Sequence, residues 1–285
     1  MFNTDHYSSR YFNDVLASGN IVIKSSDDLK KIKSEYDYYY YLPNNIKRYF
    51  VQPFNFQYVD GLASYKMERV FVDNAGETMV NGEMSIASFK RMLLRIEEFK
   101  SESIEIPEDY ESVYLESRYL VLDKTFNRIK SFHLYEESME LFERLENAYG
   151  HFIKDRSTWN KKISHGDLCL SNILWVDDIN LIKFIDPRGA KTEQDIYMDE
   201  YYDMAKLAHS VINGYDNIIF KKNFYSKEMS EILIKFFKRN KISTELLSVY
   251  QASLFLSMAP LHIDSSNRVA HFMNKCDRIL KEIGY

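Results

Sequence analysis

Three polar side chains near the middle of the chain have the types and spacing that phosphoryl transfer requires. Asp167 and Asn172 stand five positions apart within the segment His165–Leu174, and Asp186 follows fourteen positions after Asn172. A transferred phosphoryl group passes through a loose transition state whose oxygens must be neutralised by Mg²⁺, so the protein mainly supplies positioning and electrostatics. A carboxylate that orients the attacking hydroxyl, with an amide and a second carboxylate that hold the metal, would meet that need.

The residues between Asn172 and Asp186 predict a β-hairpin. The run Leu174–Val176 is apolar, residues 177–178 are both Asp and favour a turn, and Leu181–Ile185 is again mostly apolar. We therefore expect the hairpin to carry Asp186 back towards Asn172. Asn and Asp are also ordinary turn residues. Here, however, the spacing, the hairpin and the second Asp before a glycine occur together in the order that the chemistry needs.

This pattern resembles the aminoglycoside phosphotransferase and choline kinase superfamily, whose fold is similar to that of protein kinases. The residues that carry the resemblance are His165–Asp167 with Asn172, and Ile185–Asp186 after the hairpin. The longer pattern Ile185–Gly189, with Tyr201–Ser210 downstream, is similar to uncharacterised phosphotransferases found with bacterial capsule and surface-polysaccharide biosynthesis genes.

The resemblance implies a role for each polar residue of the pattern. Asp167 would be the catalytic base, Asn172 and Asp186 the Mg²⁺ ligands, and Asp203 a structural anchor of the catalytic loop. Arg188 follows the second metal ligand and could clamp an anionic acceptor or stabilise the transferring oxygens. A loop-fixing contact to a carboxylate is the alternative for this arginine.

A nucleotide-clamping lobe should precede the catalytic loop, with a strand lysine and a helix glutamate that form an ion pair. The β-branched run Ile21–Lys24 predicts a strand and resembles the V-A-I-K strand of kinases. Residues 25–28 offer helix caps, and apolar residues then recur at helical spacing up to Pro43. We expect Lys24 to reach the α- and β-phosphates of ATP and Glu35 to pair with it.

The segment before Lys24 departs from the protein-kinase pattern. It contains no G-x-G-x-x-G motif, and Gly19 is its single glycine. We therefore expect a short, glycine-poor turn near Ser18–Asn20 to cover the phosphates, as in the small-molecule kinases of the superfamily.

A hinge between two lobes should present backbone groups to adenine. Tyr65–Val70 resembles the strand-to-hinge segment of the family, with Met67 at the back of the pocket and the backbone of Glu68 and Val70 facing the base. Ile185, beside the second metal ligand, completes the predicted nucleotide contacts.

The remaining sequence predicts a helical second lobe. A chain of 285 residues can hold one or two domains, and we expect a nucleotide-binding lobe over 1–70 and a catalytic and substrate lobe over 71–285. The fold class is then α+β, a protein-kinase-like two-lobed fold with a small β-rich N-lobe and a larger, mainly helical C-lobe. Apolar spacing predicts helices over residues 86–100, 136–149, 229–237 and 246–258, and an irregular connector over 102–110.

Composition restricts the partners and the compartment. The net charge of −5 gives no electrostatic reason to expect nucleic acid. Cys169 and Cys276 lack metal-ligand spacing, and Cys169 falls in the predicted catalytic loop, so a reducing cytoplasm is the simplest expectation. The first residues lack the features of a signal peptide, and no apolar run is long enough to cross a bilayer, so we expect no membrane insertion.

The sequence thus predicts an ATP-dependent small-molecule kinase that uses Mg²⁺ and phosphorylates a hydroxyl group. The resemblance suggests a surface-polysaccharide precursor as acceptor: a sugar, polyol, amino alcohol or nucleotide-linked compound. An aminoglycoside or choline kinase and a catalytically silent nucleotide-binding module remain alternatives. A protein kinase is less favoured because no A-P-E segment or extended activation loop follows Asp186.

Overall fold

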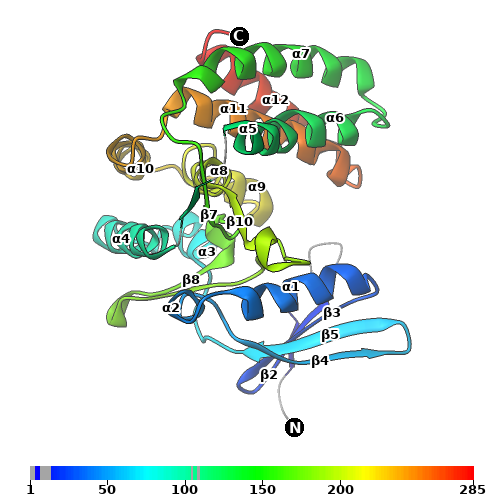
Figure 1. Ribbon diagram of the computed structural model, residues 1–285, viewed down its shortest axis with the longest axis vertical. Helices are drawn as coiled ribbons and strands as arrows, with labels where there is room; N and C mark the ends of the chain where they lie inside the picture. Colours follow the sequence, from blue (N-terminus) through cyan, green and yellow to red (C-terminus); the bar gives the residue numbers. More distant parts are fainter. Residues whose placement is uncertain (1–3, 7–13, 104, 108–109) are drawn as a thin grey trace.

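The smaller lobe is an antiparallel sheet covered on one face by a helix (Figure 1). The computed structural model describes residues 4–6, 14–103, 105–107 and 110–285. In this part of the chain the sheet has the strand order β1-β2-β3-β5-β4. The strands are β1 (Thr4–His6), β2 (Asp14–Ser18), β3 (Ile21–Ser26), β4 (Pro53–Val59) and β5 (Leu62–Glu68). The predicted Lys24 strand is thus confirmed as β3, and the strand leading into the hinge as β5.

Helix α1 (Leu29–Tyr41) lies on this sheet and also joins it to the rest of the molecule. Asp28 caps the helix by accepting a 3.0 Å hydrogen bond from the Lys31 amide, as the predicted caps required. On the buried face, Ile32 packs into a small apolar cluster with strands β4 and β5. Tyr38, two turns later, packs into the main core and donates to the Ser164 carbonyl at 2.9 Å. One helix therefore fixes the sheet relative to the catalytic loop.

The larger lobe is built from helices around the buried helix α11 (Thr244–Met258) (Figure 1). Its side chains are apolar on nearly all sides, as expected for a helix enclosed by others, and it contacts α6, α7, α8 and α12. The other helices are α2 (Asn44–Lys47), α3 (Ala75–Val80), α4 (Ile86–Glu102), α5 (Tyr110–Arg118), α6 (Lys124–Ile129), α7 (Tyr135–Phe152), α8 (Glu200–Val211), α9 (Tyr215–Phe220), α10 (Lys227–Arg239) and α12 (Ser266–Glu282).

The four predicted helices are confirmed as α4, α7, α10 and α11, and the α+β fold with a small β-rich N-lobe and a larger helical C-lobe is confirmed with them. The division of the chain at residue 70 stays a prediction. Within the described residues, no helix is both long enough and apolar enough to span a membrane.

The predicted connector over residues 102–110 contains a strand instead. Within it, β6 (Glu105–Pro107) pairs antiparallel with β7 (Asn160–Ile163), which also pairs with β10 (Tyr197–Asp199). A strand of three residues is too short to show an alternation of apolar and polar residues, and its partner strand β7 is distant in the sequence. The pairing therefore depends on the tertiary fold. Residues 104 and 108–109 of the connector lie outside the described chain.

The predicted hairpin is confirmed as β8 (Ile173–Val176) and β9 (Leu181–Phe184). Two side chains hold it against α4: the Trp175 indole donates to the Ser88 hydroxyl at 2.8 Å, and the turn residue Asp177 accepts from the Arg91 guanidinium. The hairpin is therefore attached to the helical lobe and has a fixed direction at the point where Asp186 follows.

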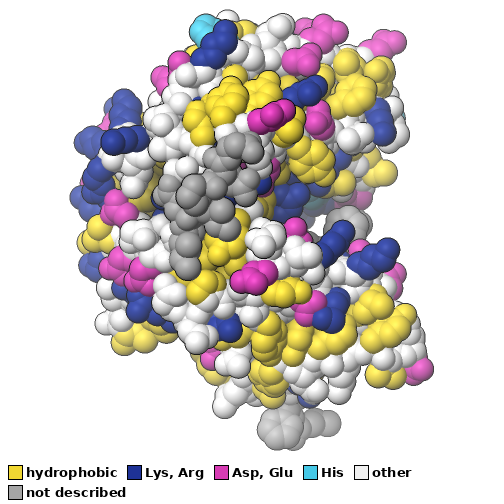
Figure 2. All heavy atoms as spheres, viewed as in Figure 1, with side chains coloured by type: hydrophobic (Ala, Val, Ile, Leu, Met, Phe, Trp, Pro, Cys, Tyr) yellow, Lys and Arg dark blue, Asp and Glu magenta, His cyan; other side chains and the backbone are white. Residues whose placement is uncertain are grey.

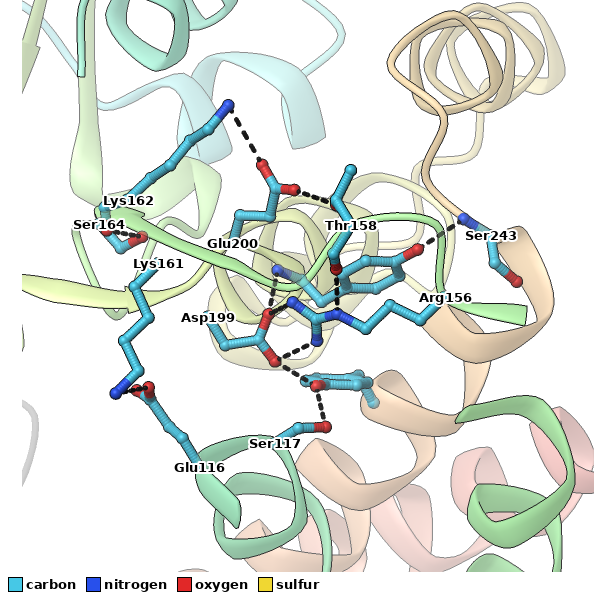
Figure 3. Close-up of polar contacts among 12 residues, drawn as sticks. Glu116, Ser117, Arg156, Thr158, Lys161, Lys162, Ser164, Asp199, Glu200 and Ser243 are labelled. Carbon is cyan, nitrogen blue, oxygen red and sulfur yellow. Dashed lines mark hydrogen bonds and ion pairs between the residues drawn. The ribbon is translucent and has the colours of Figure 1, made fainter. Parts of the chain in front are cut away.

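A buried ion pair holds the start of α8, the helix that carries Asp203 (Figure 3). The Arg156 guanidinium donates to both Asp199 carboxylate oxygens, at 2.7 and 2.9 Å, and both side chains are inaccessible to solvent. Asp199 also caps α8 by accepting from the Tyr201 amide at 3.0 Å, and it accepts from the Tyr250 hydroxyl. One carboxylate therefore joins the β7–β10 sheet, α8 and α11.

We expect Asp199→Asn to lower the free energy of unfolding by about 3–5 kcal/mol, because it leaves the buried Arg156 without its counter-charge. Denaturant unfolding measures the loss. The matched control is Glu231→Gln, which breaks the exposed Lys227–Glu231 pair and should change stability by less than about 1 kcal/mol. Equal effects of the two substitutions would contradict a structural role for the buried pair.

Candidate active site

Lys24 and Glu35 form the predicted ion pair, and Asp186 joins it. The Lys24 ammonium lies 2.6 Å from the Glu35 carboxylate and 2.8 Å from Asp186 Oδ1. Burial alone would lower the pKa of Lys24, but the charges of Asp186, Tyr65 and Glu35 outweigh it and raise the pKa above its ordinary value. The lysine therefore stays cationic while almost fully buried, which suits a group that binds phosphate.

The backbone after Asp186 packs directly on α1. The Ala190 amide donates to the Ser34 carbonyl at 2.9 Å, and a Cβ atom at Gly189 would lie 2.5 Å from the Ser34 hydroxyl. Gly189 has φ of 89°, so both its conformation and its surroundings require glycine. This contact fixes the distance between the Asp186 loop and the helix that carries Glu35.

Asp186 itself has φ of 57°. Left-handed backbone is uncommon for residues other than glycine, Asn and Asp, and in other proteins such positions gather at functional sites. The conformation turns the chain sharply after β9 and leaves the Asp186 side chain about two-fifths exposed beside the buried lysine.

Asp203 anchors the loop that carries the predicted catalytic base. Its two carboxylate oxygens accept hydrogen bonds from the backbone amides of His165 and Gly166, each at 2.8 Å. Asp203 is fully buried in the first turns of α8. Gly166 has φ of 76°, and a Cβ atom there would lie 2.6 Å from the Arg188 Cβ. The structure therefore brings Asp203 to the loop, as the resemblance implies.

His165 connects the catalytic loop to the end of the hairpin. Its Nδ1 lies 3.1 Å from the Asp167 amide, which can only donate, so Nδ1 is an acceptor. Nε2 must then carry the proton and donate to the Ile185 carbonyl at 2.8 Å. Burial lowers the pKa of His165 despite the nearby carboxylate of Asp203. In the folded protein, His165 is therefore neutral, with its proton on Nε2.

This geometry predicts a pH dependence of stability. Burial also lowers the pKa of His209, so the folded protein binds fewer protons than the unfolded chain below the ordinary value of 6.5. Stability should be complete above pH 6.5 and fall as the pH falls below it. Thermal unfolding between pH 5.5 and about 7.5 tests this. His209→Phe removes one titration and should flatten the slope; an unchanged slope would contradict the assignment.

Asp167 contacts one residue that the sequence analysis did not single out as functional. Its Oδ1 lies 2.8 Å from the Lys206 ammonium, and its Oδ2 lies 3.2 Å from the Asn172 amide nitrogen. That nitrogen also donates to the Asp167 carbonyl at 2.9 Å. Burial alone would lower the pKa of Lys206, but Asp167 raises it. The signal in the sequence is spacing, because Lys206 follows Asp203 by three positions and so shares its helix face.

Asn172 precedes the hairpin and Asp186 follows it, so both lie at its open end, where Ile173 pairs with Phe184. The Ile185 amide donates to the Asn172 carbonyl at 3.0 Å. Because the amide nitrogen of Asn172 is committed to Asp167, the amide oxygen is the group that could bind a ligand. An amide oxygen and a carboxylate are donors that suit Mg²⁺, which proteins usually bind with one or two carboxylates plus substrate phosphates.

A small pocket, with a cavity volume of about 20 Å³, lies between the lobes beside this site. Of the predicted nucleotide contacts, Glu35, Met67 and Ile185 line it. Glu68 instead pairs with Lys183 at 3.4 Å, and Val70 packs beside the small apolar cluster. The predicted roles of the last two residues concern their backbone and stay predictions. The full lining is Glu35, Tyr38, Tyr39, Phe50, Val51, Pro53, Tyr65, Met67, Phe184, Ile185, Asp186 and Pro187.

The turn over Ser18–Asn20 does not lie where a phosphate cover is needed. The Arg69 amide donates to the Asn20 carbonyl at 2.9 Å, so the turn is beside the hinge. Lys24 lies farther along β3, about 10 Å from the start of that strand at 3.3 Å per residue. This position suits the base end of a nucleotide and corrects the expectation from sequence. The connection between β1 and β2, residues 7–13, lies outside the described chain.

Arg188 is exposed and close to the catalytic loop. Its amide donates to the His165 carbonyl at 2.9 Å, and its guanidinium carbon lies 5.8 Å from the centre of the Tyr202 ring. In the part of the chain that the structure describes, its guanidinium forms no ion pair with a carboxylate. The alternative role for Arg188 was a loop-fixing contact to a carboxylate. The backbone of Arg188 does hold the loop, but among the described residues its side chain has no carboxylate partner.

Comparison with known proteins gives a match in structure alone. No family model matches the sequence, and no curated protein does so either. The aminoglycoside phosphotransferase APH(4)-Ia superposes with a TM-score of 0.66 at 12% identity, covering 99% of this chain and 94% of that one. A glucosamine kinase gives 0.59 at 11% identity, with 99% and 80% covered. The fold is that of the kinase-like small-molecule phosphotransferases.

A third similar structure is an aminoglycoside-3'-phosphotransferase of type VIII, with a TM-score of 0.57 at 15% identity over 89% of this chain and 93% of that one. APH(4)-Ia has been crystallised in ternary complexes with hygromycin B and either ADP or AMP-PNP. The predicted kinase-like, two-lobed architecture is therefore confirmed.

Proposed function

We propose that this protein is an ATP-dependent kinase that transfers a phosphoryl group to a hydroxyl of a small metabolite. One observation carries the proposal. The buried Lys24–Glu35 pair meets Asp186 at one edge of the interlobe pocket, while the Asp203-anchored loop presents Asp167 close by. A cation for phosphates, a metal-binding carboxylate and a positioned base are the parts that phosphoryl transfer needs.

Each residue then has a defined task. Lys24 holds the α- and β-phosphates, and Glu35 fixes the direction of its side chain. Asp167 accepts a hydrogen bond from the acceptor hydroxyl and takes its proton as the phosphoryl group is transferred. Asn172 and Asp186 would hold Mg²⁺, which when bound neutralises charge on the β- and γ-phosphates. The nucleotide complexes of APH(4)-Ia support ATP as the donor.

We infer that the acceptor is a precursor of a surface polysaccharide, in keeping with the resemblance of Ile185–Gly189 to capsule-associated phosphotransferases. The glucosamine kinase neighbour supports a sugar-like acceptor. A cationic aminoglycoside would require clustered carboxylates near the base, whereas Asp167 pairs with Lys206, and the Arg188 side chain packs against Gly166 next to it. Within the described chain, the buried residues Cys169 and Cys276 form no disulfide, which fits the reducing cytoplasm where ATP is available.

The silent nucleotide-binding module is the second candidate. A protein without activity gives no chemical reason for five such side chains to lie at one site: Lys24, Glu35, Asp167, Asn172 and Asp186. Their joint arrangement at one site favours the enzyme.

The test is an acceptor screen with the full-length protein, Mg²⁺ and ATP against sugars, polyols, amino alcohols, nucleotide-linked sugars, aminoglycosides and choline. Mass spectrometry should detect one acceptor heavier by a phosphoryl group, with stoichiometric formation of ADP. Lys24→Met serves as the inactive control. ATP binding without transfer to any acceptor would favour the silent module, and transfer to proteins would identify a protein kinase.

A further inference from the structure

A group of cationic side chains surrounds one buried tyrosine next to the catalytic loop. The Lys124 ammonium donates a hydrogen bond to the Tyr202 hydroxyl. Above the same ring lie the Lys124 and Lys206 nitrogens and the Arg188 guanidinium, at 4.8, 5.9 and 5.8 Å from its centre. Arg128 lies one turn after Lys124 on α6. We call these four cations, Lys124, Arg128, Arg188 and Lys206, the cationic cluster.

The cluster has few counter-charges in the described chain. Lys206 pairs with Asp167, and Arg128 donates only to the carbonyl and hydroxyl of Ser257. Lys124 forms no ion pair among the described residues. Like charges in a partly buried site repel one another, and a site that keeps them together is one that an anion can stabilise.

The pKa shifts of Lys124 and Tyr202 have the same cause, the excess of positive over negative charge around the ring. Burial lowers the pKa of Lys124, and the positive charges of Lys206 and Arg128 lower it further. Burial would raise the pKa of Tyr202, yet Lys124, Lys206 and Arg188 lower it to about 8. Tyr202 thus lies among positive charges that a bound anion would compensate.

The cluster lies next to Asp167, which Lys206 contacts, and most of it belongs to the helical lobe. Lys124 and Arg128 come from α6, and Lys206 from α8, both in the helical lobe, whereas Lys24 holds the phosphates from the opposite lobe (Figure 1). Figure 2 shows Lys and Arg side chains at the recess between the lobes. The Lys124 amide bonds to the Tyr119 carbonyl five residues earlier, which closes a π-helix over Tyr119–Asp123. Such turns are frequent at functional sites.

We propose that the cationic cluster binds a phosphate ester on the acceptor, so that the substrate is an already phosphorylated hydroxy compound such as a sugar phosphate or polyol phosphate. This inference rests on the proposed kinase function and names its substrate class. A dianionic phosphate matches several cations better than a carboxylate does, and Arg188 can bind it in a bidentate manner. Lys206, the member of the cluster that pairs with Asp167, positions the base next to this anion.

A role for the whole cluster in neutralising the transferred phosphoryl group explains the structure less well. Lys206 contacts Asp167 and could neutralise charge on the transferred phosphoryl group. Lys124 contacts the Tyr202 hydroxyl instead, and Arg128 is bound to α11 through Ser257. Among the described residues, their contacts are with Tyr202 and Ser257 and not with Asp167, so they suit a second anionic group on the acceptor.

The experiment compares matched acceptors that differ by one anionic group: glycerol with glycerol 3-phosphate, and glucose with glucose 6-phosphate and glucuronate. We expect transfer only to phosphate esters. Lys124→Met and Arg188→Ala should each raise the KM for the phosphorylated acceptor at least tenfold while the KM for ATP changes less than twofold, because each removes a charge-assisted hydrogen bond. The matched control is Lys130→Met, which removes an exposed lysine bound to Asn127 just after α6 and should change neither KM.

A second readout does not depend on turnover. A phosphate ester that binds the cluster should raise the pKa of Tyr202 and reduce its phenolate absorbance near pH 8. Tyr202→Phe should remove this signal, and Lys130→Met should keep it.

The outcomes separate the inference from the kinase proposal. Transfer to neutral or cationic acceptors, unaffected by Lys124→Met, would overturn the phosphate-ester site but leave the kinase. Preference for glucuronate over the phosphate esters would also overturn it. If ATP binding is absent, the kinase proposal fails, and the Tyr202 signal still decides the anion site: a signal that does not respond to phosphate esters overturns it.

Discussion

Replacing Asp186 with asparagine should reduce kcat by about a thousandfold or more, since a metal clamp stabilises the transition state by several kcal/mol. The affinity for Mg²⁺ and ATP together should fall, whereas binding of the nucleotide without metal should change little. Turnover measurements and calorimetry, with and without Mg²⁺, provide both quantities.

Asparagine is the appropriate replacement because it tolerates the left-handed backbone at this position, where φ is 57°. Alanine would add backbone strain to the loss of the ligand. Lys24 retains Glu35 at 2.6 Å, so the fold should persist. Asp178→Asn, in the exposed turn of the hairpin, is the matched control and should retain full activity. Normal turnover by Asp186→Asn would remove the proposed metal site.

Asp167→Asn should lower kcat by about a hundredfold to ten-thousandfold, the usual contribution of a positioned proton acceptor. The KM for ATP should stay within twofold, because the proposed nucleotide contacts, Lys24 and the hinge, belong to the other lobe. Steady-state kinetics at saturating acceptor measures the change in kcat.

Stability must be measured beside activity for this residue. Asp167 is the counter-charge of Lys206 at 2.8 Å, so the single variant leaves a largely buried lysine unpaired and should unfold more easily. The double variant Asp167→Asn/Lys206→Met removes both charges and should recover most of that loss. Its kcat should stay low. If kcat recovered together with stability, Asp167 would be a structural residue and not the base.

The elements that carry the candidate site could be predicted from sequence because they are local. Asp167 and Asn172 share one short loop, and the hairpin to Asp186 is specified by apolar runs around an Asp-rich turn. Lys24 follows a β-branched run, and Glu35 lies on a capped helix with a regular apolar face. In each case neighbouring residues determine the local backbone, so pattern and spacing were sufficient.

The position of the phosphate-covering segment was not predictable in the same way. Gly19 marks a turn, but pairing of β3 with β5 decides that this turn lies by the hinge and not at Lys24. Strand β6 was missed for a related reason, since its partner β7 lies more than fifty residues later in the chain. Strand pairing over such separations is set by the packed fold.

The cationic cluster around Tyr202 was decided by tertiary structure. Lys124, Arg188 and Lys206 come from three separate segments, and of these only Arg188 stood out in the sequence, because it follows Asp186 by two positions. Only the packing of α6, α8 and the loop after β9 gathers them around Tyr202. The sequence by itself therefore predicted a set of residues suited to phosphoryl transfer, because each of them lies within a short segment. The tertiary structure decided which charges gather in the cationic cluster, because electrostatic interactions depend on distance in space and not on separation along the chain.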